Sequence, residues 1–286
     1  MFDEVSGLKG VIGNKGIQGK PGFTGISSDK VFKIATIGAL AVVVIFFASL
    51  LISLFSYTSW NDFTSAILSR EILFAIRLSI TTATLAAIFS MIIAVPAAYA
   101  LSHSKFPGKS IVDSLLDLPI VLSPIALGAA LLIFFNTPVG SSINSNFNFV
   151  FAVPGIILAQ VTIVVALAIR LLKSTFDSID PRYEMVSRTL GYNKFQAFRS
   201  VTLPMAKNGL ISASILTWAR AVGEFGATVT LAGATAMKTE TLPTSIFLSL
   251  SSADVQKAIA VILILVIIAL IALLFIRKIV GKRPLI

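Results

Sequence analysis

Six long apolar stretches alternate with short polar segments along this chain, and this pattern constrains its fold more than any other feature. A helix of about 20 apolar residues crosses the hydrocarbon core of a membrane, and each stretch is long enough to do so. With 56% hydrophobic and 13% charged residues, the chain is too apolar for a soluble domain. The sequence therefore predicts an all-α polytopic membrane protein with six transmembrane helices, at residues 34–55, 72–101, 115–135, 150–172, 207–231 and 255–276.

The basic residues indicate which side of the membrane each polar segment occupies. Eighteen of the 23 Lys and Arg residues lie in the N-terminal tail, in the segments that follow the second and fourth stretches or at the adjoining ends of those stretches, and in the C-terminal tail. Basic residues accumulate in cytoplasmic segments. These segments and both termini are therefore predicted to be cytoplasmic, in a multi-pass protein of the plasma membrane. Segment 136–148 carries no charge and is predicted to face outside.

The N-terminal tail has a composition of its own. Glycine recurs at every third position from Gly7 to Gly25, but the run is too short and too poor in proline for a collagen triple helix. We expect a disordered cytoplasmic tail. The predicted organisation is this tail (1–32), a first transmembrane helix (33–56), a core of five helices (70–276) that includes a cytoplasmic loop (177–206), and a basic tail (277–286).

The sequence argues against several kinds of chemistry. It contains no cysteine and one histidine, His103, so it offers neither a thiolate site nor a two-histidine metal site, and we expect His103 to be solvated. The tripeptide that begins at Gly108 resembles part of a phosphate-binding loop, but His103 stands where that motif requires a glycine. We therefore expect no metal, no cofactor and no enzymatic activity in this chain. The basic charge is explained by topology, so no nucleic-acid partner is expected.

One polar island, from Glu184 to Pro204, is too charged for hydrocarbon and reads as a structured cytoplasmic loop. Gly191 is predicted to end a short helix, because glycine tolerates the left-handed conformation common after helix C-termini. A second short helix would carry Phe195 and Phe198 on one face, and Pro204 would mark the start of the next helix. Two short helices with outward-facing aromatic rings indicate a docking element. The alternative is an ordinary basic loop whose only role is to set the orientation of the protein in the membrane.

This island resembles the loop with the Glu-Ala-Ala signature in permease subunits of ABC importers. Gly191, nine residues, Val201 and the pair Leu203-Pro204 match the spacing of that signature. Met185-Val186-Ser187 stand in place of the Glu-Ala-Ala triplet, and Glu184 lies one position early. The resemblance implies that the loop docks on an ATPase subunit and couples it to the membrane helices, through Glu184, Met185, Val186, Ser187, Arg188, Leu190, Gly191, Phe195, Phe198, Arg199 and Pro204.

The fifth apolar stretch contains two ionisable residues. Arg220 and Glu224 are four residues apart, so they lie on one face of a helix where each offsets the desolvation of the other. Ionisable residues at membrane depth mark either a functional site or a structural ion pair that fixes the helix register. Both interpretations would hold if the pair belonged to a gate. The third stretch holds Pro119 and Pro124, so we expect its helix to be broken or kinked.

The segment that follows the fifth stretch is irregular. Gly233, Pro243 and several threonines favour an external element that dips back toward the membrane without crossing it and continues into a short amphipathic helix. Such an element would cover the mouth of a pore or contact an external binding protein. A simple outer loop remains the alternative.

Four segments resemble the molybdate, tungstate and sulfate branch of ABC permeases: Leu-Pro-Ile-Val-Leu-Ser-Pro-Ile-Ala-Leu-Gly (118–128), Gly-Glu-Phe-Gly-Ala-Thr (223–228), Leu-Ala-Gly (231–233) and Lys-Thr-Glu-Thr-Leu-Pro (238–243). The resemblance implies the type I ABC importer permease fold and a homodimer with one shared pathway in the lipid bilayer. It also implies two ATP-binding subunits, which bind the ATP and Mg, and an external oxyanion-binding protein.

The sequence thus predicts the permease subunit of an ATP-driven importer for a tetrahedral oxyanion, molybdate or tungstate before sulfate or thiosulfate. The dianion is expected to meet hydroxyl and backbone N–H groups at the ends of broken helices. A secondary anion transporter without an ATPase and a membrane anchor without a pore are the alternatives. The pathway or gate candidates are Ser123, Pro124, Arg220, Glu224, Thr228 and Thr230.

Overall fold

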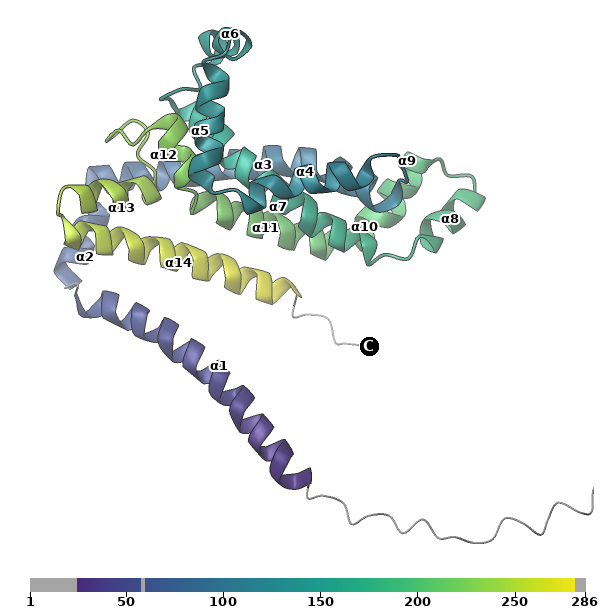
Figure 1. Cartoon of the computed structure of the whole chain (residues 1–286), viewed down its shortest axis with the longest axis horizontal. Helices are drawn as coiled ribbons and strands as arrows, with labels where there is room; N and C mark the ends of the chain where they lie inside the picture. The colour runs from purple at the N-terminus through teal and green to yellow at the C-terminus, as the bar shows by residue number, and fades with distance from the viewer. Residues whose placement is uncertain (1–24, 58–59, 281–286) are drawn as a thin grey trace, which may run out of the picture. The chain divides into compact units, whose positions relative to one another are not determined.

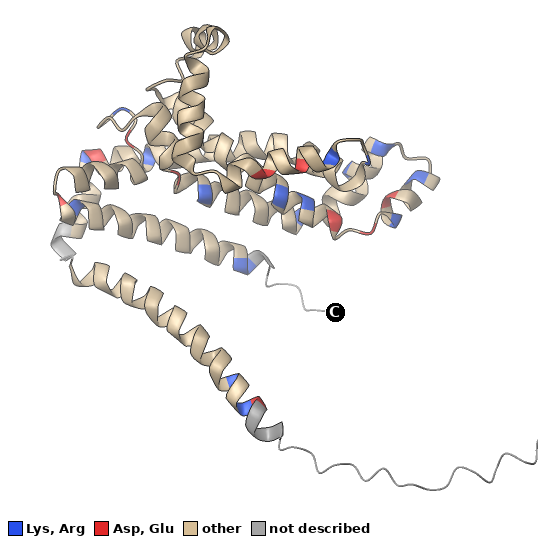
Figure 2. Cartoon of the chain, viewed as in Figure 1, with Lys and Arg blue, Asp and Glu red and all other residues tan. Residues whose placement is uncertain are grey.

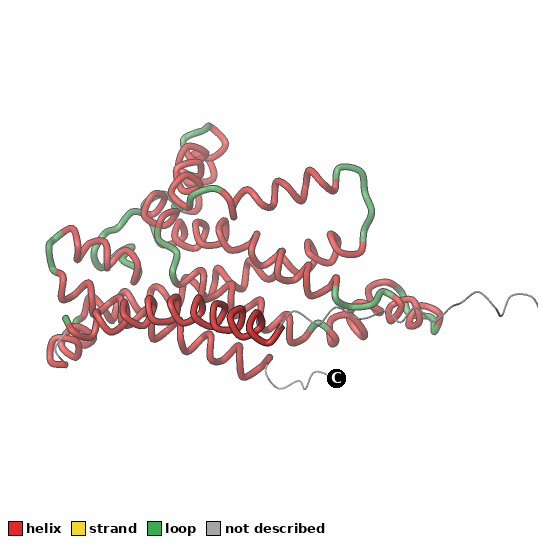
Figure 3. The backbone as a smooth tube through the Cα atoms, turned by 60° about the horizontal axis from the view of Figure 1, so that its bottom comes forward, coloured by secondary structure: helices red, strands yellow, loops and turns green. Residues whose placement is uncertain are grey.

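The computed structural model describes residues 25–57 and 60–280, and within these ranges it contains helices and loops but no strand (Figure 3). The chain divides into two units, Met1–Phe55 and Ser56–Ile286. The glycine-period tail up to residue 24 lies outside the described residues. Helix α1 (Gly25–Ser56) begins inside the tail predicted to be disordered up to residue 32, so the predicted boundary is too late there.

Helix α1 makes up the described part of the first unit, and its 32 residues carry no charge after Lys33. Its side chains are apolar on all sides, as suits a helix surrounded by hydrocarbon.

The second unit is a bundle of long helices with short helices at both ends (Figure 1). Helices α3 and α7 pack along each other, and their contact is rich in alanine, which allows backbones to approach closely. Helix α11 packs on both, and α14 packs on α11. The elements are α2 (Trp60–Leu68), α3 (Arg70–His103), α4 (Lys109–Val121), α5 (Pro124–Phe135), α6 (Pro138–Phe147), α7 (Val153–Asp177), α8 (Arg182–Thr189), α9 (Lys194–Ala197), η1 (Phe198–Thr202), α10 (Leu203–Met205), α11 (Lys207–Val222), α12 (Gly226–Ala232), α13 (Leu242–Ser251) and α14 (Val255–Val280).

Four helices among the described residues are long and apolar enough to cross a membrane: α1, α3, α7 and α14. A fifth span results if the bent pair α4 and α5 is counted as one. The predicted fifth stretch, 207–231, is divided into α11 and the short α12, and α11 has only 16 residues. The all-helical fold is therefore confirmed, whereas six continuous transmembrane helices are not.

The predicted break in the third stretch is confirmed and lies at Pro124. Helices α4 and α5 meet at an angle of 109° there, while Pro119 lies inside α4. The hydroxyl of Ser123 accepts a hydrogen bond from the backbone N–H of Ala126 at 3.2 Å, and proline suits the first position of a helix because its φ is already helical. Helix α5 consequently leaves the bundle at a steep angle and leads to α6 (Figure 1).

The irregular stretch after α12 is confirmed. Gly233, with φ of 75°, ends α12, and α13 follows after a loop. The amphipathic character of α13 is the reverse of that in a surface helix, because Ser245 and Ser249 are buried whereas Phe247 and Leu250 are exposed. The end of the bundle at α13 therefore has a polar interior.

Candidate functional site

Helices α5 and α12, which both begin at a break in an apolar stretch, pack tightly against each other. A Cβ atom on Gly226 would lie 2.9 Å from Cβ of Pro124, and one on Gly128 would lie 2.8 Å from Cα of Ala227. Side chains larger than hydrogen do not fit at these two glycines. This contact brings Pro124 and Thr230, two of the pathway candidates, to the same junction.

The predicted ion pair in the fifth stretch is formed. Arg220 Nη1 lies 2.8 Å from Glu224 Oε2, and the side chain of Glu224 is 1% exposed while that of Arg220 is 40% exposed. Glu224 Oε1 also accepts a hydrogen bond from the backbone N–H of Ala227 at 3.1 Å. The carboxylate therefore lies at the start of α12, where a negative charge is favourable.

The other hydroxyl candidates differ in accessibility. Thr228 is fully buried, and within the described residues its hydroxyl has no hydrogen-bond partner. The hydroxyl of Thr230 donates to the carbonyl of Gly226 at 2.8 Å. Ser123 is exposed and caps α5. Ser123 is thus the most exposed of these three, Thr230 is half-buried and Thr228 is buried.

Gln160, which the sequence reading missed, supports the break between α11 and α12. Its side chain is 1% exposed, and its amide Nε2 donates to the carbonyl of Ala221 at 3.0 Å. Carbonyls near the end of a helix lose their usual partners in the next turn. The Ala221 carbonyl accepts the backbone N–H of Glu224 at 3.1 Å, and Gln160 supplies a second donor from α7. A lone amide in the middle of an apolar stretch was the available signal.

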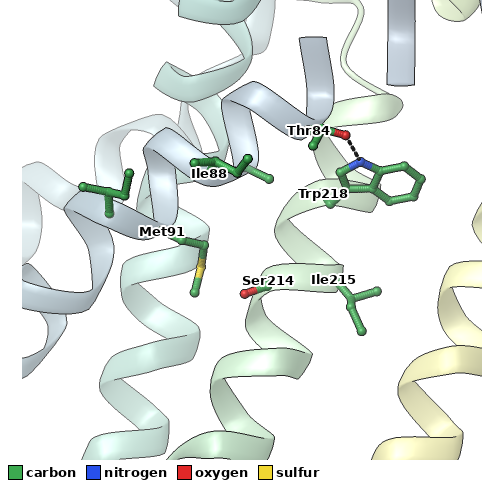
Figure 4. A pocket seen from close by; sticks show the side chains of 8 residues that line it. Thr84, Ile88, Met91, Ser214, Ile215 and Trp218 are labelled. Carbon is green, nitrogen blue, oxygen red and sulfur yellow. Dashed lines mark hydrogen bonds between the residues drawn. The ribbon is translucent and has the colours of Figure 1, made fainter. Parts of the chain in front are cut away.

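A groove of about 450 Å³ runs between α3 and α11 (Figure 4). Trp218 closes one end, where its indole N–H donates to the hydroxyl of Thr84 at 3.1 Å. Most of the lining is apolar, and Ser214 adds a hydroxyl group. The residues that line it are Thr84, Ala87, Ile88, Met91, Ile92, Ser214, Ile215 and Trp218.

The polar island folds as two short helices joined at a glycine, as predicted. Helix α8 ends at Thr189, and Gly191 follows with φ of 95°. Asn193 starts α9 with a reciprocal capping box, in which its side chain and that of Gln196 each accept a backbone N–H at 2.9 Å. Pro204 stands at the second position of the three-residue helix α10.

The outer surface of this loop combines apolar and basic side chains. Met185, Val186, Leu190 and Phe195 are all more than half exposed, with Leu190 at 78% and Phe195 at 68%. Arg188 and Arg199 are exposed beside them, and Ser187 is buried. Figure 2 shows several blue segments, which mark Lys and Arg, at the end of the second unit that holds α8 and α9.

The predicted outward position of both aromatic rings is wrong for Phe198. Its ring packs inward against Tyr99 and Phe176, with ring centroids 4.7 and 6.3 Å apart. Residues three apart on a helix differ by about 60° in direction, and here that difference separates Phe195 on the surface from Phe198 in the bundle. Of these two phenylalanines, the loop therefore exposes Phe195 alone.

Four further polar contacts anchor this end of the bundle. Tyr99 and Thr202 both donate to the carboxylate of Glu184. Arg170 on α7 binds Asp113 Oδ1 at 2.9 Å and Asp117 Oδ1 at 2.6 Å, which ties α4 to α7. The acidic pair, four residues apart on one helix face, was a readable signal that the sequence reading did not use. His103, expected to be solvated, is half-buried and stacks on Tyr99 at 4.5 Å.

The fold and this site define a class: a multi-pass helical membrane protein with an exposed loop of short helices between two of its long helices. Residues 86–283 match the family model of the binding-protein-dependent transport system inner membrane component, and the chain belongs to this family. It falls in the branch of molybdate, tungstate and sulfate permeases.

Two relatives and one solved structure illustrate this assignment. The chain is 35% identical over 216 residues to the probable molybdenum ABC transporter permease protein of Haloferax volcanii, covering 76% of this chain and 78% of that protein. It is 29% identical over 226 residues to a sulfate transport system permease protein of Synechocystis, covering 78% and 82%. A bacterial alginate ABC transporter, crystallised with its alginate-bound periplasmic protein, has the same fold, with TM-score 0.71, 19% identity and coverage of 89% and 95%.

Proposed function

We propose that this chain is the membrane-spanning subunit of an ATP-driven importer for a tetrahedral oxyanion, molybdate or tungstate. Two copies form one pathway, two separate ATP-binding subunits dock on the cytoplasmic loops, and an external binding protein delivers the oxyanion. Both termini lie in the cytoplasm. The observation that carries the proposal is the docking loop with its exposed apolar and basic surface in a chain that belongs to the permease family.

Energy from ATP must enter through another chain. The sequence holds no complete phosphate-binding loop, so ATP and Mg are bound by the partner ATPase. Closure of two ATPase subunits moves α8 and α9, and the loop passes this movement to α7 and α11, which flank it in the sequence. A partner surface with apolar pockets and acidic rims would complement Leu190, Phe195 and the exposed arginines.

The oxyanion meets neutral donors along its way, because transport requires weak binding and release. Ser123 is the most exposed hydroxyl among the pathway candidates. The buried Glu224 acts instead as a structural cap of α12, with Arg220 offsetting its charge. Molybdate and tungstate precede sulfate because relatives named for molybdenum transport match with higher identity than those named for sulfate.

The test is oxyanion uptake and ATP hydrolysis in proteoliposomes that contain this chain, its candidate ATPase and a molybdate-loaded binding protein. Wild-type protein should take up molybdate only with ATP, and loaded binding protein should stimulate hydrolysis. Changing Leu190 and Phe195 together to alanine should abolish this stimulation and release the ATPase. The matched control is Phe147→Ala, which removes a ring that is 63% exposed on α6 and should leave uptake unchanged.

Two results would contradict the proposal. Uptake without ATP would favour the secondary transporter, and an intact ATPase complex with the double variant would show that the loop is not the docking element. Competition by sulfate, thiosulfate and tungstate in the same assay ranks the substrates, and stronger competition by sulfate than by tungstate would move the assignment to the sulfate alternative.

A further inference from the structure

Glu184 differs from its neighbours on the docking loop because its carboxylate is held inside this chain. The hydroxyl of Tyr99 donates to Glu184 Oε2 at 2.9 Å, and the hydroxyl of Thr202 donates to Glu184 Oε1. Thr202 is fully buried, and Glu184 and Tyr99 are half-buried. Each carboxylate oxygen thus has a neutral donor from a different part of the chain. We call these three residues the Glu184 anchor.

The three residues come from elements far apart in the sequence. Tyr99 lies in the last turns of α3, Glu184 in the first turn of α8, and Thr202 at the end of η1. The anchor therefore joins the docking helix α8 directly to α3, which corresponds to the second apolar stretch. The two helices are not adjacent in the sequence. Helix α8 itself buries a single residue, Ser187, so side-chain packing alone holds it weakly.

The ring of Tyr99 is fixed on three sides. It stacks on His103 with ring centroids 4.5 Å apart and meets Phe198 and Phe176 edge-on at 4.7 and 6.0 Å. Such aromatic contacts restrict the ring to one orientation. The hydroxyl is consequently directed at Glu184 by packing, and it has little freedom to follow α8 if the hydrogen bond breaks.

We infer that Tyr99 is a positioning residue for coupling: through Glu184 it transmits the movement of the docked α8 to α3. The inference rests on the proposed importer function and deepens it. A hydrogen bond to a charged group biases an equilibrium by about ten- to a hundredfold, enough for α3 to follow α8. Without the anchor, α8 still presents its exposed apolar surface to an ATPase, but its movement is lost before it reaches α3.

The experiment uses the full chain with its ATPase and a molybdate-loaded binding protein in proteoliposomes. Tyr99→Phe and Thr202→Val each remove one hydroxyl with little change of shape. We expect both to lower the stimulated hydrolysis and the uptake by about tenfold or more, while the ATPase still co-purifies and basal hydrolysis is unchanged. Thr202→Ser restores a hydroxyl and should restore coupling. Tyr57→Phe, at a tyrosine that is 76% exposed, is the matched control.

The outcomes separate this inference from the proposed function. If wild-type protein couples and both hydroxyl variants couple equally well, the anchor is refuted and the importer stands. Loss of ATPase association in these variants would also overturn the inference, because the anchor would then serve docking. If Tyr99→Phe does not fold, the comparison of Thr202→Val with Thr202→Ser tests the inference instead. If no ATPase associates with the wild-type chain, the proposed importer function itself is refuted.

Discussion

The junction of α5 and α12 gives a sharp test of the fold at the candidate site, through Gly226→Ala. A Cβ atom at position 226 would meet Cβ of Pro124 at 2.9 Å and the backbone nitrogen of Ile125 at 3.0 Å. Neither neighbour is the far end of a flexible side chain, so the helices must separate. Overpacking of this kind costs about 1–3 kcal/mol. For a chain of this size we expect the melting temperature in detergent to fall by roughly 2–12 °C.

Gly223→Ala is the matched control for this prediction, since both glycines belong to the same short segment. A Cβ atom at position 223 would have no neighbour closer than 3.8 Å, and the φ of −86° suits alanine. The melting temperature of this variant should therefore equal that of the wild type. Gly128→Ala, which approaches the junction from α5, should act like Gly226→Ala. Equal melting temperatures for Gly226→Ala and Gly223→Ala would refute the close contact of the two broken helices.

Three further predictions concern the buried polar groups and the topology. Gln160→Leu removes one of the two hydrogen bonds that the Ala221 carbonyl accepts, the other coming from the backbone N–H of Glu224 at 3.1 Å, and should destabilise the protein by about 0.5–1.5 kcal/mol in a thermal unfolding assay; wild-type stability would show that the amide is dispensable. Arg220→Met should be more harmful to folding than the double change with Glu224→Met, because it leaves the buried carboxylate uncompensated; an additive result would contradict this. Since the chain has no cysteine, single cysteines can map topology: an impermeant thiol reagent should label Ser142→Cys in intact cells but Lys194→Cys only after permeabilisation.

The features that the sequence predicted correctly depend on local backbone constraints. Pro124 cannot continue the preceding helix, and Gly191 accepts a positive φ, so the break and the turn follow from residues within a few positions. The pairing of Arg220 with Glu224 follows likewise from helical spacing. The pattern from Gly191 to Pro204 also consists of residues close in the sequence, and it was sufficient to indicate the family.

The features that the sequence did not predict depend on contacts between distant segments. Nothing near Glu184 indicates that Tyr99, 85 positions earlier, donates to it. The inward turn of Phe198 depends on the position of α3, and the role of Gln160 depends on where α11 ends. A hydrophobic pattern cannot distinguish a side chain that faces lipid, a partner or the bundle, because all three require apolar groups.

Helix α3 connects the two ends of the second unit by specific polar contacts. Near its outer end, Ser79 accepts a hydrogen bond from the backbone N–H of Leu242 at 2.7 Å, at the start of α13. In its middle, Thr84 receives the indole N–H at the end of the groove, and near its inner end Tyr99 binds the docking helix. If α3 shifts when the loop of α8 and α9 moves, as the coupling proposal requires, the groove and the start of α13 should therefore change together. The contacts that link them are hydrogen bonds between neutral groups, and no charged residue lines the groove.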